Sequence, residues 1–278
     1  MECDAYMRFI KEKIMKYEFG FIGCGNMGGA LATACLKAIK PKKIAVCDYD
    51  EQKVNHFKAL GAKAATAQEI AQNASFIVLG VKPQVMESAL SPVAQILQKR
   101  TDAIIITMGA GVSISAIRSF IGADLPVIRI MPNTPALVGE AMILYSVEGV
   151  DERDEKAFLK GFAPAGKFDK IPESEIDAAS ALSGCGPAFV YAFARGLVKG
   201  AKEAGVDEDK AFAYTAQTLI GAAKMLQAYG DPDTLIKNVC SPGGTTIEGI
   251  KSLEKADFDN ITASAVTAAY KRTLELKK

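Results

Sequence analysis

The chain has few of the histidine and paired cysteine residues from which metal sites and disulfide-bonded scaffolds are built. It has no tryptophan, one histidine (His56), and six scattered cysteines of which no two form a CxxC pair. A zinc site is therefore not expected, because such sites gather cysteine and histidine ligands at close spacing. Scattered cysteines fit a reducing cytosol. We expect a cytoplasmic protein whose cysteines pack as small apolar side chains.

The chain also lacks a charge excess and a long apolar run. Its 33 basic residues offset 32 acidic ones, so nothing indicates nucleic acid as a partner. No apolar run reaches the roughly 18 residues that a membrane helix needs. The first residues, MECDAYMRFIKEKIMK, lack the apolar core of a signal peptide. We expect neither nucleic acid nor a membrane as a partner, and we interpret residues 1–16 as an N-terminal extension without chemistry.

Strand-like and helix-like segments alternate in the front half of the chain. We expect strands at 18–23, 43–48, 75–81, 103–108 and 126–131, and helices at 26–39, 51–61 and 113–121. Two further segments, 141–146 and 166–171, could extend the sheet. Alternation of this kind predicts an α/β fold with a parallel, doubly wound sheet. We assign residues 17–175 to a Rossmann-like dinucleotide-binding domain.

The pattern changes after about residue 175, where strand signals stop. Alanine-rich helical segments follow at 186–204, 207–229 and 257–276. We therefore expect residues 176–278 to form an all-helical domain. The last segment has small residues at close spacing, which favours partner helices from a second subunit. Simple packing within one chain is the alternative.

A dinucleotide fingerprint, GCGNMG, lies between the first expected strand and the first expected helix. In such a turn the first glycine permits a tight bend, the second lets a pyrophosphate approach, and the third lets the helix pack on the sheet. The phosphates would lie at the helix N-terminus, where free N–H groups favour anions. The cofactor contacts predicted here are Gly23, Cys24, Gly25, Asn26, Met27 and Gly28.

Asp48 follows the second expected strand, at the position that distinguishes NAD from NADP in dinucleotide-binding domains. An acid at this position accepts hydrogen bonds from the ribose 2′-OH of NAD and would repel the 2′-phosphate of NADP. The sequence therefore favours NADH and leaves NADPH as an alternative, which Lys42, Lys43 and Lys53 could help to bind. Asp48 could instead cap the next turn, and Asp50 could take the ribose role.

Three more loops follow strands on the same edge of the predicted sheet: VKPQ (81–84), GAGVS (109–113) and MPNTP (131–135). Strand ends on this edge face the cofactor crevice of a doubly wound sheet. The predicted cofactor contacts in these loops are Val81, Lys82, Pro83, Ala110 and Asn133. For Lys82 a solvent-exposed lysine in a turn, and for Asn133 turn stabilisation, are the alternatives.

The segment CSPGGTTIE, from Cys240 to Glu248, predicts a binding turn before a helix. A Ser-Pro turn followed by two glycines lets the backbone curl tightly and approach a ligand. Thr245 or Thr246 could cap the helix. Free N–H groups in such a turn form a socket for a small anion such as a carboxylate. Together with the fingerprint, this suggests a reductase that holds a small carboxylate beside a nicotinamide.

Five motifs in a fixed order carry a family resemblance. FIGCGNMG, VKPQ, RIMPNTP, LSGCGPAF and SPGGTTIEG follow one another along the chain. With them the chain resembles the Δ1-pyrroline-5-carboxylate reductases from about residue 17 to its C-terminus, and the last two motifs are the specific ones. The resemblance implies hydride transfer from NAD(P)H to the C=N carbon of pyrroline-5-carboxylate, which gives L-proline in the last step of proline biosynthesis. It also implies homodimers through interlocked helical domains, often assembled into rings.

The resemblance further implies roles for particular residues. The substrate carboxylate would be held by the loop containing Ser241, Gly243, Gly244, Thr245 and Thr246. Thr246 would act in catalysis by hydrogen bonding to the ring nitrogen, and Asn238 would reach the nicotinamide or hold Lys82. Ser183 and Gly186 would lie near the active site, with packing as their alternative role. Asp48 departs from the family, because many members have a small polar residue there.

The expected chemistry fits a site without histidine. A protonated cyclic imine is already a strong hydride acceptor, so the enzyme needs mostly orientation. A hydroxyl donor at the nitrogen can assist without a strongly perturbed acid.

Two other functions are weighed against this one. A β-hydroxyacid dehydrogenase would need a lysine on the early interdomain helix and an asparagine one turn later, but that helix has no lysine before Lys199 and no such asparagine. A non-catalytic dinucleotide sensor should have lost the substrate loop, which is intact here.

Overall fold

The computed structural model describes residues 16–276, which separate into two compact units. One unit runs to Gly184 and takes in the chain from Tyr270, and the other is Cys185–Ala269. The expected N-terminal extension, apart from Lys16, lies outside the described residues. The domain boundary expected near residue 175 stays a prediction.

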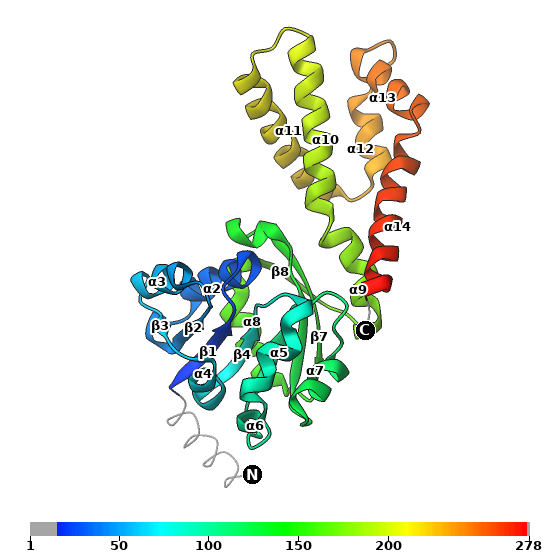
Figure 1. The fold of residues 1–278 in the computed structure, drawn as a ribbon. Helices are drawn as coiled ribbons and strands as arrows, with labels where there is room; N and C mark the ends of the chain where they lie inside the picture. Colours follow the sequence, from blue (N-terminus) through cyan, green and yellow to red (C-terminus); the bar gives the residue numbers. More distant parts are fainter. Residues whose placement is uncertain (1–15, 277–278) are drawn as a thin grey trace. The chain divides into compact units, whose positions relative to one another are not determined.

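The first unit is built on one eight-stranded sheet of order β3-β2-β1-β4-β5-β6-β7-β8 (Figure 1). The strands are β1 (Tyr17–Ile22), β2 (Ile44–Cys47), β3 (Lys63–Ala64), β4 (Ala74–Leu79), β5 (Ile104–Thr107), β6 (Val127–Met131), β7 (Ala141–Glu148) and β8 (Gly166–Lys170). Neighbouring strands pair in parallel except β6 and β7. The predicted α/β fold with a doubly wound sheet is confirmed. The antiparallel pair follows from the short connection through η4 (Thr134–Val138) and Gly139, which is too short for a parallel crossover.

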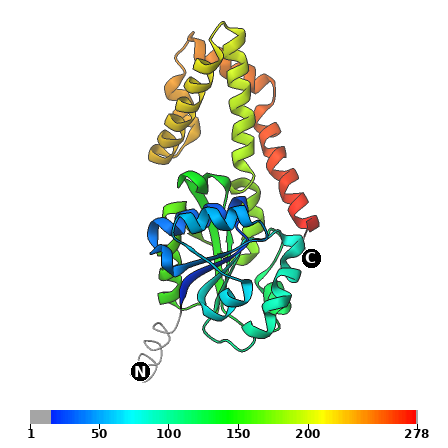
Figure 2. The ribbon, with the colours of Figure 1, turned by 60° about the vertical axis from the view of Figure 1, so that its left-hand side comes forward.

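Helices cover both faces of this sheet (Figures 1 and 2). They are α2 (Asn26–Ala38), α3 (Glu51–Ala59), α4 (Ala67–Asn73), α5 (Met86–Leu90), α6 (Ala94–Leu97), α7 (Ile114–Ile121), α8 (Glu152–Phe162) and α9 (Glu173–Ser183). Short 3₁₀ turns join them at η1 (Pro41–Lys43), η2 (Pro83–Val85), η3 (Ser91–Val93) and η5 (Ala163–Ala165). The strands are apolar on both sides because both faces are covered.

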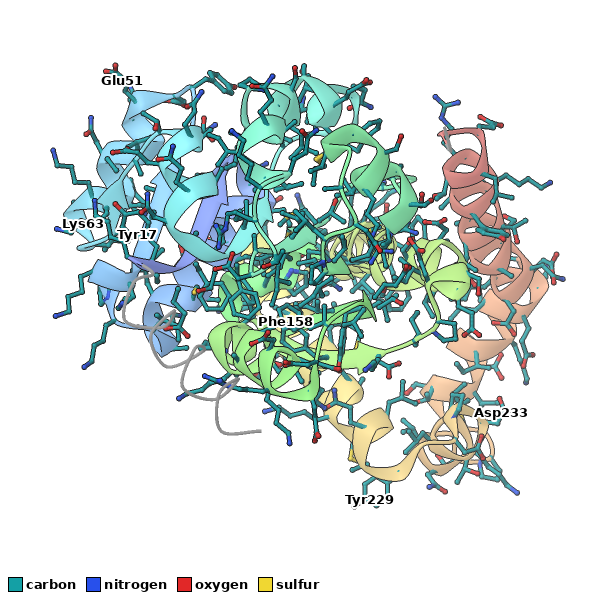
Figure 3. The ribbon with its side chains drawn as sticks, turned by 90° about the horizontal axis from the view of Figure 1, so that it is seen from below. Tyr17, Glu51, Lys63, Phe158, Tyr229 and Asp233 are labelled. Carbon is teal, nitrogen blue, oxygen red and sulfur yellow. The ribbon has the colours of Figure 1, made fainter. Side chains whose placement is uncertain are left out.

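The buried apolar side chains form two large clusters, one on each face of the sheet, and a small third one of Met131, Leu144 and Ile176. On one face Phe19 and Phe21 pack with α2 and with Phe158 and Phe162 of α8. On the other face Ile77 and its neighbours pack against α4, α5, α6 and α7. Figure 3 places Phe158 among the side chains of this unit and Glu51 and Lys63 at its outer edge.

The second unit is helical throughout, as expected. Its helices are α10 (Gly186–Glu203), α11 (Glu208–Tyr229), α12 (Pro232–Val239), α13 (Thr245–Lys255) and the first part of α14 (Phe258–Leu276). Helices α10, α12 and α13 bury no residue, and α11 buries only Ala211 and Thr215. Large apolar side chains are exposed instead, among them Tyr191, Phe212, Tyr214, Tyr229, Val239 and Ile261. Apolar surface on this scale marks an interaction site, because a helical unit needs a covered apolar face to be stable.

One helical stretch, Glu173–Glu203, is long and apolar enough to cross a membrane by length and composition. The stretch is no continuous apolar run of that length, but its average composition over 18 residues is apolar enough. Small alanine, serine and glycine residues dilute the apolar ones, which hides the stretch from a reading based on continuous apolar runs. The stretch comprises two helices, α9 and α10, and Asp177 in the first is buried and paired with Arg129.

Gly161 on α8 sets how closely that helix approaches β1. A Cβ atom there would lie 2.4 Å from Cζ of Phe19, a fully buried ring. We expect Gly161→Ala to lower the free energy of unfolding by about 1–3 kcal/mol, the usual cost of overpacking a core. Urea denaturation should show this loss, while Lys160→Ala on the exposed side of the same helix serves as the control. Equal stability of the two variants would contradict the tight contact.

Candidate active site

The turn between β1 and α2 brings backbone segments into close contact. Gly23 adopts a φ of 95° and its N–H donates to the Cys47 carbonyl at 2.8 Å. A Cβ on Gly28 would lie 2.4 Å from the Gly23 oxygen, so glycine is required where α2 crosses the turn. Gly25 is the N-cap of α2, and no side chain caps the helix. A Cβ on Gly25 would meet nothing within 4 Å, so the free N–H groups of the first turn have room for an anion.

Gly80 packs against the same turn, although the sequence predicts it inside the strand at 75–81. It follows β4, and its N–H donates to the Ile22 carbonyl at 2.8 Å. A Cβ there would lie 2.1 Å from the Gly23 oxygen and 3.2 Å from the Gly28 Cα. A glycine directly after a buried strand on the cofactor edge was the signal that could have identified it.

Asp48 holds the glycine turn in place. Its carboxylate accepts hydrogen bonds from the Cys24 N–H at 2.6 Å and from the Asp50 N–H at 2.9 Å. The side chain is only 3% exposed. The capping role considered for Asp48 is thus observed, and the same carboxylate joins the ends of β1 and β2. Burial, followed by the nearby Asp48 charge, raises the pKa of the Cys24 thiol to about 12, so this cysteine stays neutral.

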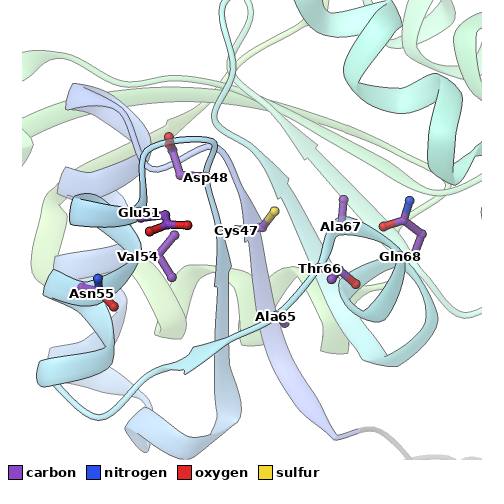
Figure 4. A pocket seen from close by; sticks show the side chains of 9 residues that line it. All are labelled: Cys47, Asp48, Glu51, Val54, Asn55, Ala65, Thr66, Ala67 and Gln68. Carbon is purple, nitrogen blue, oxygen red and sulfur yellow. The ribbon is translucent and has the colours of Figure 1, made fainter.

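A pocket of about 560 Å³ opens beside Asp48 at the ends of β2 and β3 (Figure 4). It is lined by Cys47, Asp48, Glu51, Val54, Asn55, Ala65, Thr66, Ala67 and Gln68. Two carboxylates, Asp48 and Glu51, therefore line it. The nearby Lys53 ammonium lies 3.6 Å from an Asp50 oxygen and 4.0 Å from an Asp48 oxygen, so carboxylates already balance its charge.

The other predicted cofactor residues of the first unit lie on the same edge. Val81, Lys82 and Pro83 follow β4, and the exposed Ala110 follows β5. Parallel neighbours β1, β2, β4, β5 and β6 all end there, which is the edge where doubly wound sheets bind ligands.

Asn133, also at this edge, is engaged within the protein at both ends of its amide. Its Nδ2 donates to the Ser183 carbonyl at 2.8 Å, and its Oδ1 accepts from the Met142 N–H at 3.2 Å. The alternative of turn stabilisation is thus observed. Its predicted contact with the cofactor stays a prediction.

The second unit contains the other predicted turn. The Gly244 N–H donates to the Ser241 carbonyl at 3.0 Å across Pro242, and Gly243 has a φ of 71°. This is the pattern of a type II turn, which needs glycine at its third position. A Cβ on Gly244 would lie 2.5 Å from the Ser241 Oγ and 3.1 Å from the Ser241 carbonyl oxygen, so a larger residue there would displace the serine side chain.

This turn leads directly into α13, which begins at Thr245. Gly244 is the N-cap and no side chain caps the helix, so the expectation that Thr245 or Thr246 caps it is wrong. Both threonines lie in the first helical turn, where their N–H groups have no intrahelical acceptor. Ser241, Thr245, Thr246 and Asn238 on α12 are exposed. The predicted substrate residues are therefore together around one accessible helix N-terminus.

His56 and Ser183 lie outside these two turns. His56 is exposed on α3. Ser183 ends α9, and its carbonyl accepts the Asn133 hydrogen bond. Among the residues that the structure describes, no group of three or more histidine, cysteine or acidic side chains is placed to hold a metal ion.

Two protein-family models match this chain, one near each end. Residues 18–111 match the family model "NADP oxidoreductase coenzyme F420-dependent", and residues 173–276 match "Pyrroline-5-carboxylate reductase dimerisation". Pyrroline-5-carboxylate reductase 3 of Rattus norvegicus is 35% identical over 264 residues, which cover 93% of this chain and 96% of the relative. Pyrroline-5-carboxylate reductase of Escherichia coli is 35% identical over 270 residues, covering 95% and 100%.

Solved structures of such reductases share the fold over nearly the whole chain. The Plasmodium falciparum pyrroline carboxylate reductase with NADP bound has a TM-score of 0.84 at 29% identity, covering 95% of this chain and all of that one. The enzyme from Coxiella burnetii has a TM-score of 0.86 at 29% identity, covering 95% and 99%.

The open space at Gly25 predicts a separation between folding and binding. Gly25 has a φ of −64°, which alanine adopts easily, and a Cβ there meets nothing. We expect Gly25→Ala to keep the thermal stability of the ligand-free protein but to weaken NAD(P)H binding at least about 10-fold, because the methyl group would occupy the predicted path of the pyrophosphate. Fluorescence titration and thermal unfolding measure the two effects.

Gly80→Ala is the matched comparison, because its Cβ meets backbone rather than open space. It should lower stability even without ligand. Normal dinucleotide affinity in Gly25→Ala would contradict a pyrophosphate at this turn.

Proposed function

We propose how cofactor and substrate are held in this chain, which belongs to the pyrroline-5-carboxylate reductase family. It is an oxidoreductase that reduces the C=N bond of 1-pyrroline-5-carboxylate to L-proline with a nicotinamide cofactor, in proline biosynthesis. Family membership sets aside the β-hydroxyacid dehydrogenase and sensor alternatives.

One observation carries the assignment of the site. Among the described helices whose N-caps are defined, α2 and α13 are the two with a glycine N-cap, and neither has a side-chain cap. Helices α5, α6, α9 and α10 also lack a side-chain cap, but none of them has glycine as its N-cap. Helices α3, α4, α7, α8, α11 and α12 are all capped by an aspartate, serine or threonine side chain. An uncapped N-terminus after a glycine turn leaves N–H groups and the positive end of the helix dipole for an anion. We assign the dinucleotide pyrophosphate to α2 and the substrate carboxylate to α13.

The cofactor-binding set follows from the first assignment. Gly23, Cys24, Gly25, Asn26, Met27 and Gly28 hold the pyrophosphate, and Asp48 lies at the adenosine end. Val81, Lys82, Pro83, Ala110 and Asn133 would line the edge toward the nicotinamide. Asn238 on α12 is the cofactor contact that the family resemblance suggests for the second unit. The open space at Gly25 and the pocket beside Asp48 fit such a ligand.

The substrate-binding set is Ser241, Gly243, Gly244, Thr245 and Thr246. When bound, NAD(P)H supplies a hydride to the C=N carbon. The imine nitrogen takes its proton from solvent before hydride transfer, so that hydride addition to the carbon leaves a neutral amine. We assign to the Thr246 hydroxyl the hydrogen bond that holds this nitrogen. The α13 backbone N–H groups orient the ring through its carboxylate. Orientation suffices because a protonated imine is already electrophilic.

Thr246→Ala tests the catalytic assignment. Losing a hydrogen bond to a charged group costs about 1.5–3 kcal/mol, so turnover should fall by about 10- to 100-fold. The Kd for NAD(P)H should hardly change. Thr246→Ser keeps the hydroxyl and should retain most of the activity. Equal losses of cofactor affinity and turnover in Thr246→Ala would contradict the role.

We further propose that the chain prefers NADH. Two carboxylates, Asp48 and Glu51, line the pocket where the adenosine ribose would lie, and its lining contains no arginine or lysine. A 2′-phosphate carries about two negative charges and would be repelled there. Asp48 can still accept a ribose hydroxyl, because a carboxylate has about four lone-pair positions and two backbone N–H bonds are observed.

Rates of NADH and NADPH oxidation at saturating pyrroline-5-carboxylate test this preference. In Asp48→Ser, the ratio of kcat/KM for NADPH to that for NADH should rise at least about fivefold, because a like-charge contact of about 1 kcal/mol is removed. Glu51→Gln should shift the ratio in the same direction and leave the hydrogen bonds of Asp48 intact. An unchanged ratio in both variants would contradict the assignment. Absence of turnover with either cofactor in the wild-type protein would contradict the assignment of pyrroline-5-carboxylate as the substrate.

A homodimer is the assembly that we propose, with rings of dimers as a further step. Residues 173–276 match the family's dimerisation model, and the helices of the second unit bury almost nothing by themselves. A partner copy would cover the exposed apolar side chains. We propose the same explanation for the apolar Glu173–Glu203 stretch, 6% of whose apolar window is buried, in place of a membrane. A cytoplasmic location fits the scattered free cysteines.

A further inference from the structure

Both ends of helix α9 are hydrogen-bonded to loops at the predicted cofactor edge of the sheet. At its first residue, Glu173 Oε1 accepts the Ile114 N–H at 2.7 Å. At its last residue, the Ser183 carbonyl accepts from Asn133 Nδ2 at 2.8 Å. Ile114 begins α7 and closes the loop after β5, while Asn133 lies in the loop after β6. One helix therefore connects two of the loops that follow parallel strands on this edge.

A buried cation fixes the position of α9 on the sheet. The Arg129 side chain on β6 is 3% exposed, and its Nη1 lies 3.2 Å from Glu173 Oε1. Its Nη2 lies 2.5 Å from Asp177 Oδ1. Two carboxylates one helical turn apart on the same guanidinium define both the place and the rotation of the helix. Such a pair is costly to break from one side, because the remaining charge is left buried.

Glu173 links this cation to the cofactor loop. The same oxygen that faces Arg129 accepts the first N–H of α7, where a carboxylate is also favoured by the helix dipole. The loop that ends there contains Gly111 at a φ of 73° and a turn in which the Val112 N–H donates to the Gly109 carbonyl at 3.2 Å. Its path is therefore set by its two ends, β5 on one side and the Glu173 hydrogen bond on the other.

We propose that Glu173 is a positioning residue for the cofactor, which holds the loop at residues 108–113 through the Ile114 N–H. The proposal rests on the proposed function, because it needs the dinucleotide to lie along this edge. Glu173 does not touch the cofactor itself. It transmits the position of α9, fixed by Arg129 and Asp177, to the loop that carries Ala110.

The full-length variants Glu173→Gln and Glu173→Asp test this role. The aspartate keeps a negative charge near Arg129 but is one methylene too short to hold the Ile114 N–H. Glu173→Asp should raise Kd and KM for NADH and NADPH by about 5- to 10-fold, which is part of the effect of losing one hydrogen bond to a charged group, since Glu173 acts through the loop. Glu173→Gln should raise them by less, because its amide oxygen can still accept the Ile114 N–H. The kcat at saturating cofactor and the KM for pyrroline-5-carboxylate should stay within about twofold, because the α13 turn is untouched. Amide exchange in residues 108–116 should become faster.

Glu175→Gln is the matched control, because it is an exposed glutamate in the same helical turn. It should behave as wild type in every measurement. A folded Glu173→Asp variant with wild-type Kd and wild-type exchange would overturn the proposal. So would a uniform loss of kcat, both KM values and thermal stability, which indicates mere structural support. Failure of wild type to bind either dinucleotide would instead contradict the proposed function, so the two failures are distinguishable.

Discussion

The binding edge of the first unit depends on the space around one backbone oxygen. A Cβ atom on Gly28 would lie 2.4 Å from the Gly23 carbonyl oxygen, and one on Gly80 would lie 2.1 Å from it. Three segments, the β1–α2 turn, the start of α2 and the end of β4, therefore meet through backbone alone. The Asp48 carboxylate then fixes the turn to β2 by accepting the Cys24 N–H. With its backbone held this way, the α2 N-terminus can stay uncapped and still be rigid enough to bind an anion.

The fold was predictable where one signal dominates. Continuous apolar runs gave the strands β1, β2, β4, β5 and β6, since strands buried on both faces contain little else. The two-residue strand β3 (Lys63–Ala64) has both residues exposed and no apolar pattern, so it exists only through pairing with β2. Helix α9 was not predicted because its buried side includes Asp177 and Ser180. Asp177 can be buried because Arg129, 48 residues earlier in the chain, pairs with it, and Ser180 can be buried because its hydroxyl donates to the Asp177 carbonyl within the helix.

The candidate site was predictable by residue type more than by role. Glycine positions Gly23, Gly28 and Gly244 follow from what a turn demands, and the structure gives each of them a close backbone or side-chain neighbour. Asp48 and Asn133 were selected as polar groups on the correct edge, yet both are engaged in hydrogen bonds within the protein. A sequence shows which side chains can bind a ligand, but their partners inside the fold depend on distances between segments far apart in the chain.

The two turns to which we assign ligands differ in how they are supported. The α2 turn is supported by a buried sheet, whereas α13 belongs to a unit whose helices α10, α12 and α13 bury no residue. Orientation of a small ring to within a fraction of an ångström requires a rigid support. Helices that expose Tyr191, Phe212 and Tyr214 cannot provide one alone. If the α13 turn holds the substrate carboxylate as proposed, covering these side chains by a second copy would give the turn the rigid support that it lacks within one chain.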